Sequence, residues 1–389
     1  MENQTMTLAE KALLMHEKWN GKLETIAKSK VNSREDLAIA YTPGVAEPCK
    51  VIAKAPEAAY KYTMKANTVA VISDGSAVLG LGNIGAYAAM PVMEGKCVLF
   101  KEFGDVNAVP ICLDTQDTEE IIATIKNIAP AYGGINLEDI SAPRCFEIEE
   151  RLKEMLDIPV FHDDQHGTAI VVLAGIINGL RVTGKKKEDC RVVVNGAGSA
   201  GVAITKLLLT YGFRHVTMCD REGIIGKDYP NLNWMQQKMT EVTNLEDQHG
   251  TLADALKGAD IFVGVSAPNI VTPEMVASMN HDSILLAMAN PVPEIMPDVA
   301  KAAGARIVGT GRSDFPNQVN NVVAFPGIFK GALEGRATQI TEEMKLAAAE
   351  AIAGLVSDEE LNDEFIMPEA FDPRVAQVVS EAVRSHIVR

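Results

Sequence analysis

The stretch RVVVNGAGSAGVAITKLLLTYG, residues 191–212, decides the fold of the second half of the chain. A run of β-branched residues leads into a glycine-rich turn, and an apolar segment of helical composition follows. The turn has the G-x-G-x-x-G spacing of a dinucleotide-binding unit, in which glycines permit a tight turn and close backbone approach to a pyrophosphate at the helix N-terminus. The candidate cofactor-binding residues are Gly196, Ala197, Gly198, Ser199, Ala200 and Gly201.

A second strand, HVTMCD (215–220), follows this helix and ends in Asp220, nineteen residues past Gly201. A carboxylate at that point hydrogen-bonds the ribose hydroxyls of the cofactor and favours NAD over NADP. Arg221 comes directly after it and could reach a 2′-phosphate, so NADP stays open as an alternative.

Strands and helices continue to alternate beyond this unit, in ADIFVGVS, SILLAMAN and ARIVGTG. Five strands separated by helices predict an α/β fold with a Rossmann-type, doubly wound parallel sheet. Upstream, a second α/β domain is expected, with strands in 67–75, 106–114 and 158–162. Its helices are expected over 5–28, 118–129 and 144–156. A buried helix is expected over 167–184. The predicted domains are 1–160 and 161–389, and the helices after about residue 327 could pack on either.

Composition and charge exclude several classes of protein. The 389 residues carry a net charge of −16, which repels polyanions and argues against a nucleic-acid partner. The N-terminus has no signal-peptide pattern, and the apolar runs fall short of a membrane span. Six scattered cysteines without metal-finger spacing indicate a reducing compartment without disulfides. We expect a cytoplasmic protein with no membrane association.

A second glycine pattern, Gly80, Gly82 and Gly85, lacks the downstream strand that ends in an acid. Two interpretations are equally favoured. The loop either needs positive φ angles near a substrate or is a purely structural turn.

Acidic pairs occur in two short segments, Glu138–Asp139 and the Asp163–Asp164 pair of FHDDQHGT (161–168). One acid at a helix start is explained by capping and by the helix dipole, but two are not. Four carboxylates suit a hard divalent cation such as Mg²⁺ or Mn²⁺. On spacing alone, a solvated turn is slightly favoured for Glu138–Asp139.

Several long motifs of this chain together resemble the malic enzyme family, in its short bacterial form. The resemblance runs in order from about residue 16 to residue 389. The motifs are YTPGVAEPC (41–49), SDGSAVLGLGNIGAYAAMPVMEGKCVLFKEF (73–103), NLEDI, FHDDQHGTA, NGAGSAG, ANPVPE (289–294) and PNQVNNVVAFPG (316–327).

The resemblance assigns roles to individual residues. It implies a divalent metal on Glu138, Asp139 and Asp164, with Asp163 beside a catalytic lysine, Lys96. The remaining assignments are Tyr41 as the family's tyrosine, and Lys96, Asn290 and Asn321 as substrate-binding residues, with Asn320 as a rival to Asn321.

The implied reaction is oxidative decarboxylation of (S)-malate to pyruvate and CO₂ with reduction of NAD. Lys96, with a pKa lowered by burial and by the metal, would take the hydroxyl proton while hydride leaves C2. The metal would act as a Lewis acid for the enolate, and Tyr41 would protonate C3. Decarboxylation of oxaloacetate and a homodimer or higher homo-oligomer are also implied.

One position departs from the longer family members, because Ala77 stands where they carry a carboxylate-binding arginine. The substrate carboxylate must then be held by the Gly80–Gly85 loop, by the metal or by the two asparagines. Three alternatives remain: a malolactic enzyme that forms lactate, a metal-assisted dehydrogenase for another hydroxy acid, and a non-catalytic nicotinamide-binding regulator.

Overall fold

Two β-sheets organise the chain, and the computed structural model describes residues 6–78 and 80–387. The N-terminal sheet is parallel, in the order β2-β1-β3-β4. Its strands are β1 (Thr68–Ser73), β2 (Asn107–Cys112), β3 (Gly134–Leu137) and β4 (Val160–His162). The sequence analysis did not predict β3. The strand has only four residues and begins with glycine, so its periodicity is too short to detect.

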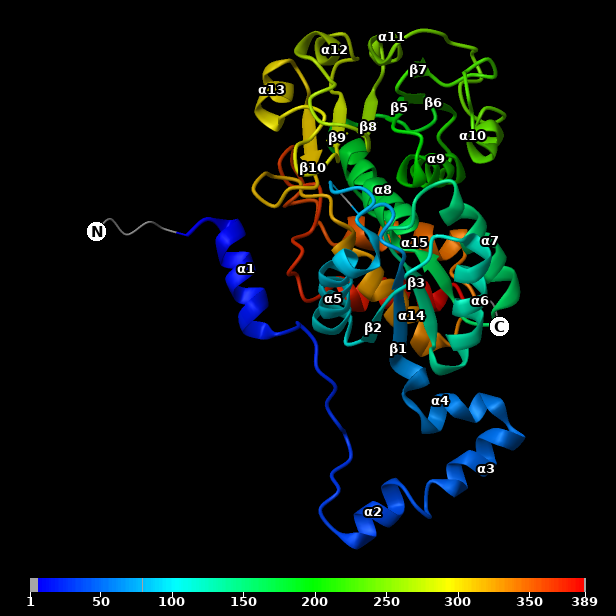
Figure 1. Cartoon of the computed structure of the whole chain (residues 1–389). Helices are drawn as coiled ribbons and strands as arrows, with labels where there is room; N and C mark the ends of the chain where they lie inside the picture. The colour runs from blue at the N-terminus through cyan, green and yellow to red at the C-terminus, as the bar shows by residue number, and fades with distance from the viewer. Residues whose placement is uncertain (1–5, 79, 388–389) are drawn as a thin grey trace.

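Helices cover this sheet and connect its strands (Figure 1). They are α5 (Gly85–Gly104), α6 (Thr118–Ile128), η3 (Ala129–Ala131) and α7 (Arg144–Met155). The inner face of α5 is apolar and packs against β1 and β2. β2 lies at the sheet edge and is only half-buried, although its composition predicted a buried strand.

The C-terminal sheet has the order β10-β9-β8-β5-β6-β7. The five predicted strands are present and parallel: β5 (Arg191–Asn195), β6 (His215–Asp220), β8 (Ile261–Gly264), β9 (Ile284–Ala287) and β10 (Ile307–Thr310). A two-residue strand, β7 (Gly223–Ile224), pairs antiparallel with β6 at one edge, so the sheet is mixed rather than purely parallel. The order reverses between β5 and β8, which is where doubly wound sheets bind dinucleotides.

The helices of this half are α9 (Ser199–Tyr211), α10 (Trp234–Met239), α11 (Leu252–Leu256), α12 (Pro273–Ala277) and α13 (Pro297–Ala302). Between the two sheets runs α8 (Asp163–Thr183), which contacts α9. Among the described residues α8 alone is long and apolar enough to span a membrane, contrary to the expectation from its sequence. Most of it is buried inside the protein, which accounts for its composition.

The C-terminal helices pack on both halves of the molecule. They follow the short η4 (Asn321–Val323) and are α14 (Phe325–Gly335), α15 (Glu342–Gly354) and α16 (Val375–Ser385). α14 packs against α5, and α15 packs against α8. Four buried phenylalanines make edge-to-face contacts where these helices meet the N-terminal sheet: Phe100, Phe161, Phe325 and Phe329.

The N-terminal segment leaves the body of the protein (Figure 1). It contains α1 (Leu8–Trp19), α2 (Arg34–Ala40), α3 (Ala46–Lys54), η1 (Pro56–Ala58), α4 (Ala59–Tyr62) and η2 (Met64–Asn67). The helix predicted over 5–28 is shorter than expected, because Asn20 and Gly21 adopt positive φ after Trp19. Its first residue, Thr5, lies outside the described residues. We call residues 23–62 the arm.

Candidate active site

The Asp163–Asp164 pair opens α8 directly after β4. The residue in the N-cap position is His162, and its side chain makes no capping bond. Asp163 is fully buried, and its Oδ1 has no hydrogen-bond partner among the described residues. A side chain at position 167 would come within 1.9 Å of that oxygen, so Gly167 leaves the room in which Asp163 sits. Capping therefore does not explain this pair.

Lys96 comes from the inner face of α5 and reaches the same place. Its Nζ donates a hydrogen bond to Asp163 Oδ2 and lies 2.9 Å from Glu138 Oε1. The ring of Phe325 lies 4.0 Å from Nζ and forms an apolar wall with a cation–π contact. Lys96 is itself buried. Its ammonium group on α5 thus contacts residues of α8 and α14 and the residue that follows β3.

The charge state of Lys96 in the protein alone follows from its two carboxylate neighbours. Burial alone would lower the pKa of Lys96, but Asp163 and Glu138 outweigh burial and hold the pKa above its ordinary value. Burial raises the pKa of Asp163 to about 6, against the opposing effect of Lys96. Burial likewise raises the pKa of Glu138. The predicted lowering of the Lys96 pKa included a bound metal and stays a prediction; in the protein alone, two carboxylates stabilise the ammonium form.

Asn321 belongs to this cluster, whereas Asn320 serves another purpose. Asn321 Nδ2 donates to Asp163 Oδ2 at 2.5 Å. The side chain of Asn320 caps η4 by accepting from the backbone N–H of Val322.

The Glu138–Asp139 pair lies at the carboxyl end of β3, beside the start of α8. Glu138 is 6% exposed and Asp139 is 5% exposed, so the interpretation as a solvated turn is wrong. Asn136 Nδ2 donates to Glu138 Oε2 at 2.9 Å, and the backbone N–H of Asp139 donates to Asp164 Oδ2 at 2.7 Å. The three predicted metal-binding acids are thus held in one region by short contacts.

The charges at this place are unbalanced. Lys96 is paired with both Glu138 and Asp163, and Asp163 Oδ1 has no hydrogen-bond partner among the described residues. A divalent cation would compensate the negative charge of buried carboxylates that outnumber the nearby cations. Within residues 6–78 and 80–387, no group of three His, Cys, Asp or Glu side chains is arranged to hold a metal as they stand. Lys96 already contacts Glu138, and the backbone N–H of Asp139 already donates to Asp164, so a metal would compete with these two contacts for the carboxylate oxygens.

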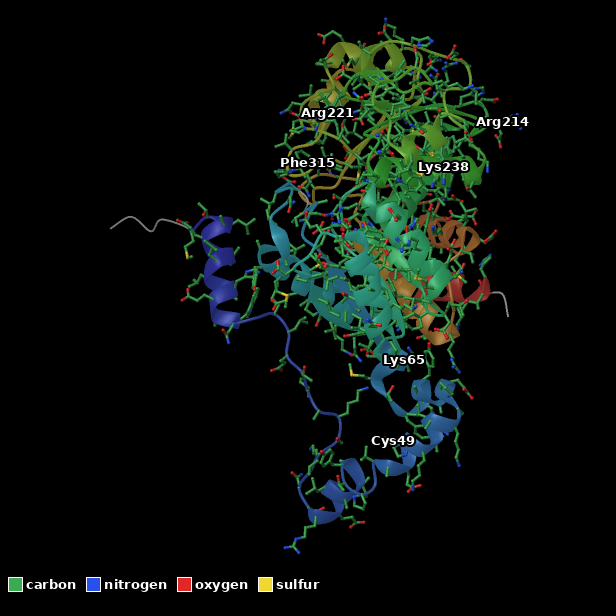
Figure 2. All side chains as sticks on the ribbon, turned by 45° about the vertical axis from the view of Figure 1, so that its right-hand side comes forward. Cys49, Lys65, Arg214, Arg221, Lys238 and Phe315 are labelled. Atoms are coloured by element: carbon green, nitrogen blue, oxygen red, sulfur yellow. The ribbon has the colours of Figure 1, made fainter. Side chains whose placement is uncertain are left out.

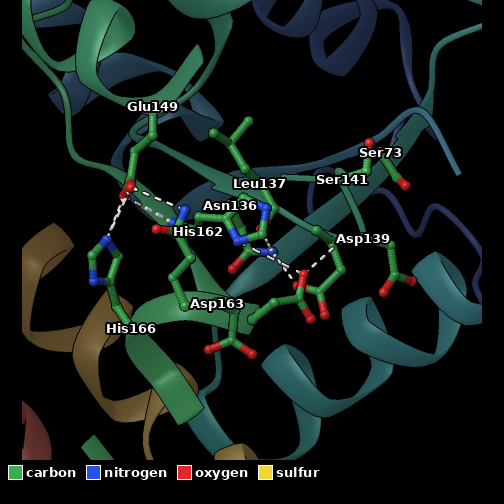
Figure 3. A network of polar contacts seen from close by, with 12 residues as sticks. Ser73, Asn136, Leu137, Asp139, Ser141, Glu149, His162, Asp163 and His166 are labelled. Carbon is green, nitrogen blue, oxygen red and sulfur yellow. Dashed lines mark hydrogen bonds and ion pairs between the residues drawn. The ribbon is translucent and has the colours of Figure 1, made fainter. Parts of the chain in front are cut away.

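A buried carboxylate that the sequence analysis missed supports the start of α8 (Figure 3). Glu149, on α7, accepts hydrogen bonds from the backbone N–H of His162 at 3.2 Å and from His166 Nε2 at 2.8 Å. Lys345 of α15 donates to the other ring nitrogen of His166 at 3.0 Å. Burial lowers the pKa of His166 to about 4, so this ring is neutral. Figure 3 shows His166 turned toward Glu149 while Asp163 points away from it.

The cofactor turn has the backbone that its glycines predict. Gly196 has φ +110°, and a Cβ there would lie 2.5 Å from Val265 O. A Cβ at Gly201 would lie 1.7 Å from Gly196 O, so helix α9 packs closely on the turn. Asp220 ends β6 and is half-buried.

Two further residues make hydrogen bonds at the carboxyl ends of β5 and β8, where the strand order of the sheet reverses. Asn195 Nδ2 donates to Ser266 Oγ at 2.6 Å across the carboxyl ends of these strands. The fully buried Glu294 accepts from the backbone N–H groups of Ser266 and Ala289 at 2.9 and 3.0 Å. Glu294 therefore fixes the loop that precedes Asn290. The sequence analysis missed both residues, although Glu294 belongs to the ANPVPE motif.

The second glycine loop has positive φ at Gly80, Gly82 and Gly85, which both interpretations allow. A Cβ at Gly80 would lie 3.4 Å from the carbonyl oxygen of Asn290. The loop thus touches the exposed Asn290 segment of the C-terminal half. Ala77 precedes this loop in the sequence, and its backbone N–H donates to Asp139 O at 2.9 Å.

Arg144, the first residue of α7, contacts the segment that precedes Ala77. It donates to Asp74 Oδ2 at 2.8 Å and to Ser76 Oγ at 3.0 Å. These bonds tie the arginine to this segment. The sequence analysis did not single it out.

Tyr41 is the predicted site residue that the structure does not bring to the others. It lies between α2 and α3 in the arm and is 67% exposed. Figure 1 places α2 and α3 well apart from α5 and α8.

Comparisons with known proteins agree along the whole chain. Residues 20–153 match the family model "Malic enzyme, N-terminal domain", and residues 165–388 match "Malic enzyme, NAD binding domain". The NAD-dependent malic enzyme of Geobacillus stearothermophilus is 57% identical over 97% of this chain and 78% of its own length. The bifunctional malic/malolactic enzyme of Bacillus subtilis is also 57% identical, over 97% of this chain and 92% of its own.

A solved structure gives the same result in three dimensions. The crystal structure of NAD-dependent malic enzyme from Thermotoga maritima superposes with a TM-score of 0.93 at 52% identity. The match covers 96% of this chain and 98% of that one.

Proposed function

The chain belongs to the malic enzyme family, and we propose how its own residues carry out the oxidative decarboxylation of malate with a nicotinamide dinucleotide. The observation that carries the proposal is the buried contact of Lys96 with Asp163 and Glu138. A lysine held this way, beside excess carboxylates, is placed to move a proton at the substrate hydroxyl.

The first step oxidises malate at C2. Lys96 Nζ takes the hydroxyl proton. The Gly196–Gly201 turn would hold the nicotinamide cofactor, which would supply the acceptor for the hydride that leaves C2. Lys96 must enter this step as a neutral amine, and Asp163 is placed to accept its surplus proton. Asn321, which donates to Asp163, fixes the direction in which that carboxylate faces Lys96. The products of this step are oxaloacetate and the reduced cofactor.

Glu138, Asp139 and Asp164 are the residues that would hold Mg²⁺ or Mn²⁺. When bound, the ion would neutralise these carboxylates, lower the pKa of Lys96 and withdraw electron density from the C2 oxygen.

The second step releases the C4 carboxyl group as CO₂, and the electron pair of the C3–C4 bond moves toward the C2 oxygen. C3 of the resulting enolate then needs a proton, which we assign to the hydroxyl of Tyr41. Lys96 passes the proton that it took from the substrate hydroxyl to the Tyr41 phenolate, so both residues return to their starting states and pyruvate is the product. The same residues would decarboxylate added oxaloacetate.

Several loop residues are available to bind the substrate and the cofactor. Asn290, Asn321 and the backbone amides of the Gly80–Gly85 loop are the groups available for the substrate carboxylates where Ala77 offers no charge. Asp220 at the end of β6 favours NAD, because a carboxylate there repels a 2′-phosphate. Six free thiols, four of them buried, fit a reducing compartment, and we propose the cytoplasm.

A direct assay tests the proposed function. The purified protein with malate, NAD and Mn²⁺ should produce NADH and pyruvate in equal amounts, and NADP should be the poorer cofactor. Tartrate, isocitrate and lactate, tested beside malate, should give little turnover. Loss of malate without NADH or pyruvate would contradict the assignment.

A second activity has a specific reason to be measured. The Bacillus subtilis relative is named as a bifunctional malic/malolactic enzyme, so lactate should be assayed in the same reactions. Lactate formed without net NADH would identify malolactic turnover, in which the bound cofactor returns its hydride to pyruvate.

A further inference from the structure

The carboxyl ends of β9 and β10 place two loops side by side, at the edge of the C-terminal sheet toward the N-terminal half (Figure 1). The two strands are parallel, and their last residues, Ala287 and Thr310, are paired in register. Asn290 follows β9, and Arg312 follows β10. Doubly wound sheets bind ligands outside the carboxyl ends of their strands, so both side chains start from the place where a substrate is expected.

The guanidinium of Arg312 contacts the Asn290 loop directly. Its Nη1 donates to the carbonyl oxygen of Pro291 at 3.0 Å. The same loop meets the second glycine loop, because a Cβ on Gly80 would lie 3.4 Å from Asn290 O. The ring of Phe315 lies 5.4 Å from the guanidinium carbon, and Figure 2 shows Phe315 on the C-terminal half, toward its border with the N-terminal half. Arg312 therefore adjoins two of the groups proposed to bind the substrate carboxylates.

Binding of a dicarboxylate at this site needs a cation that the residues around Lys96 do not supply. Lys96 is paired with Glu138 and Asp163. Ala77 offers no charge, and the whole chain carries a net charge of −16. A divalent ion on the three proposed metal-binding acids would leave no net positive charge over. A dianionic substrate such as malate is repelled by this field unless a positive group is placed to meet it.

Arg312 already binds a carboxylate in the way in which a substrate carboxylate would be bound. Its Nε and Nη2 donate to Asp314 Oδ1 and Oδ2 at 2.8 and 2.6 Å. This two-pronged geometry is the one in which arginine recognises carboxylates. The side chain of Asp314 is 56% exposed and that of Arg312 is 31% exposed. An ion pair so open to solvent contributes little to stability, so another carboxylate can replace Asp314 on the guanidinium.

We propose that Arg312 binds the C1 carboxylate of malate and that this carboxylate replaces Asp314. The inference rests on the proposed function. The choice of C1 follows from the chemistry, because the C4 carboxylate leaves as CO₂ and loses its charge. A guanidinium paired with C4 would stabilise the charged substrate and oppose that step. The C1 carboxylate keeps its charge from malate to pyruvate, so Arg312 can hold it throughout the reaction.

The kinetics of Arg312→Gln test this assignment. The C1 carboxylate has the same charge in the substrate and in the transition state, so loss of its partner should raise the KM for malate and change kcat little. We expect a KM about 10- to 100-fold higher, a kcat within about threefold and an unchanged Kd for NAD. Arg312→Lys keeps the charge without the planar fork and should give an intermediate KM. An unchanged KM would overturn the proposal, and so would an increase confined to the Kd for NAD.

Two monoamides of malate separate direct binding from a structural effect on the Asn290 loop. The 4-amide keeps the C1 carboxylate, whereas the 1-amide lacks it, and inhibition constants against malate are measured for both. Arg312→Gln should weaken the 4-amide by the same factor as malate and leave the 1-amide within about twofold. Equal weakening of the two amides would show that Arg312 only positions the loop and would overturn the proposal. Weakening of the 1-amide alone would assign Arg312 to C4 and would overturn it as well.

Two further variants serve as a test of the exchange and as a control. Asp314→Asn removes the carboxylate that malate replaces, so the KM for malate should fall by at least about twofold. An unchanged or higher KM would contradict the exchange. Arg306→Gln removes an arginine that precedes β10 and pairs with Asp363, and it should keep the wild-type KM and kcat. A KM raised as much as in Arg312→Gln would show a general effect of surface charge and would overturn the assignment.

Direct binding separates a failure of this inference from a failure of the proposed function. Titration calorimetry measures the affinity of the 4-amide for the wild type and for Arg312→Gln without any turnover. A wild type that oxidises malate but binds the 4-amide no better than Arg312→Gln does would overturn the inference and leave the proposed function standing. An affinity that depends on Arg312, in a protein that forms no NADH from malate, would contradict the proposed function alone.

Discussion

Lys96 Nζ lies 2.9 Å from Glu138 Oε1 while it donates to Asp163 Oδ2. One ammonium group therefore connects the carboxyl end of β3 with the first residue of α8, far apart in sequence. It holds together a residue assigned to the metal and a residue assigned to proton transfer. Any cation that binds Glu138 must compete with this lysine, so metal binding and the protonation of Lys96 are linked in one site.

Removal of divalent metal should abolish turnover, and Mn²⁺ should restore it. The reason is that the carboxylates around Lys96 exceed the positive charge available to them. Glu138→Gln and Asp164→Asn should each lower kcat by at least about 100-fold. NAD binding, measured by fluorescence titration, should be unchanged. Full activity in an EDTA-treated, metal-analysed preparation would remove these acids from the assigned role.

Substitution of the buried Glu149 should disturb the site through the start of α8. Glu149→Gln leaves Lys153 and the His162 N–H without a carboxylate partner, and we expect the free energy of unfolding to fall by about 3 kcal/mol. Urea denaturation measures this change. Glu150→Gln, on the exposed side of the same helix, is the control and should change stability by less than about 0.5 kcal/mol. Equal effects of the two would contradict a structural role for Glu149.

Asp220 should set the cofactor preference. Asp220→Ala removes the negative charge at the end of β6 and should raise kcat/KM with NADP at least several-fold while lowering it with NAD. Parallel kinetics with both nucleotides give the ratio. Asp228→Ala removes an exposed carboxylate farther along the same segment and should leave the ratio unchanged. A ratio that does not respond to Asp220→Ala would place cofactor selection elsewhere.

Four of the six thiols should resist alkylation in the folded protein. Burial raises the pKa of Cys190 to about 11 and the pKa of Cys219 to about 12, so both stay protonated at pH 8, where only thiolates react. Cys97 and Cys145 are buried in the same way. Iodoacetamide followed by mass spectrometry should find label at Cys49 and Cys112 alone until the protein is unfolded. Early labelling of Cys190 or Cys219 would show that the C-terminal sheet opens locally.

The Rossmann-type half could be predicted because its signals are local and repeated. The turn from Gly196 to Gly201, the strands around it and Asp220 all occur within thirty residues, in a fixed order. The parts that were missed are short. β3 has four residues and β7 has two, too few for a hydrophobic period to be recognised.

Prediction of the acidic site from the sequence required both the reading of its residues and the resemblance to the family. Spacing alone could not show that Glu138 and Asp139 are buried, because burial depends on β3, which was not predicted. Glu149 shares the buried face of α7 with Cys145, Ile148 and Leu152. An acidic residue on an otherwise apolar helical face is the sequence pattern from which Glu149 could have been predicted as a functional or structural residue. The position of Tyr41 outside the body depends on how the arm is anchored at Lys22 and Lys65, which no local pattern reveals.

The central claim is that Lys96 is the group that moves protons at malate. The most direct test compares Lys96→Ala with the wild type for turnover and for NAD affinity in the same preparations. We predict that kcat falls by at least about 1,000-fold while the Kd for NAD stays within twofold, because Lys96 belongs to α5 of the N-terminal half and the Gly196–Gly201 turn leads into α9 of the C-terminal half. Retained turnover, or a parallel loss of turnover and NAD binding, would contradict the account.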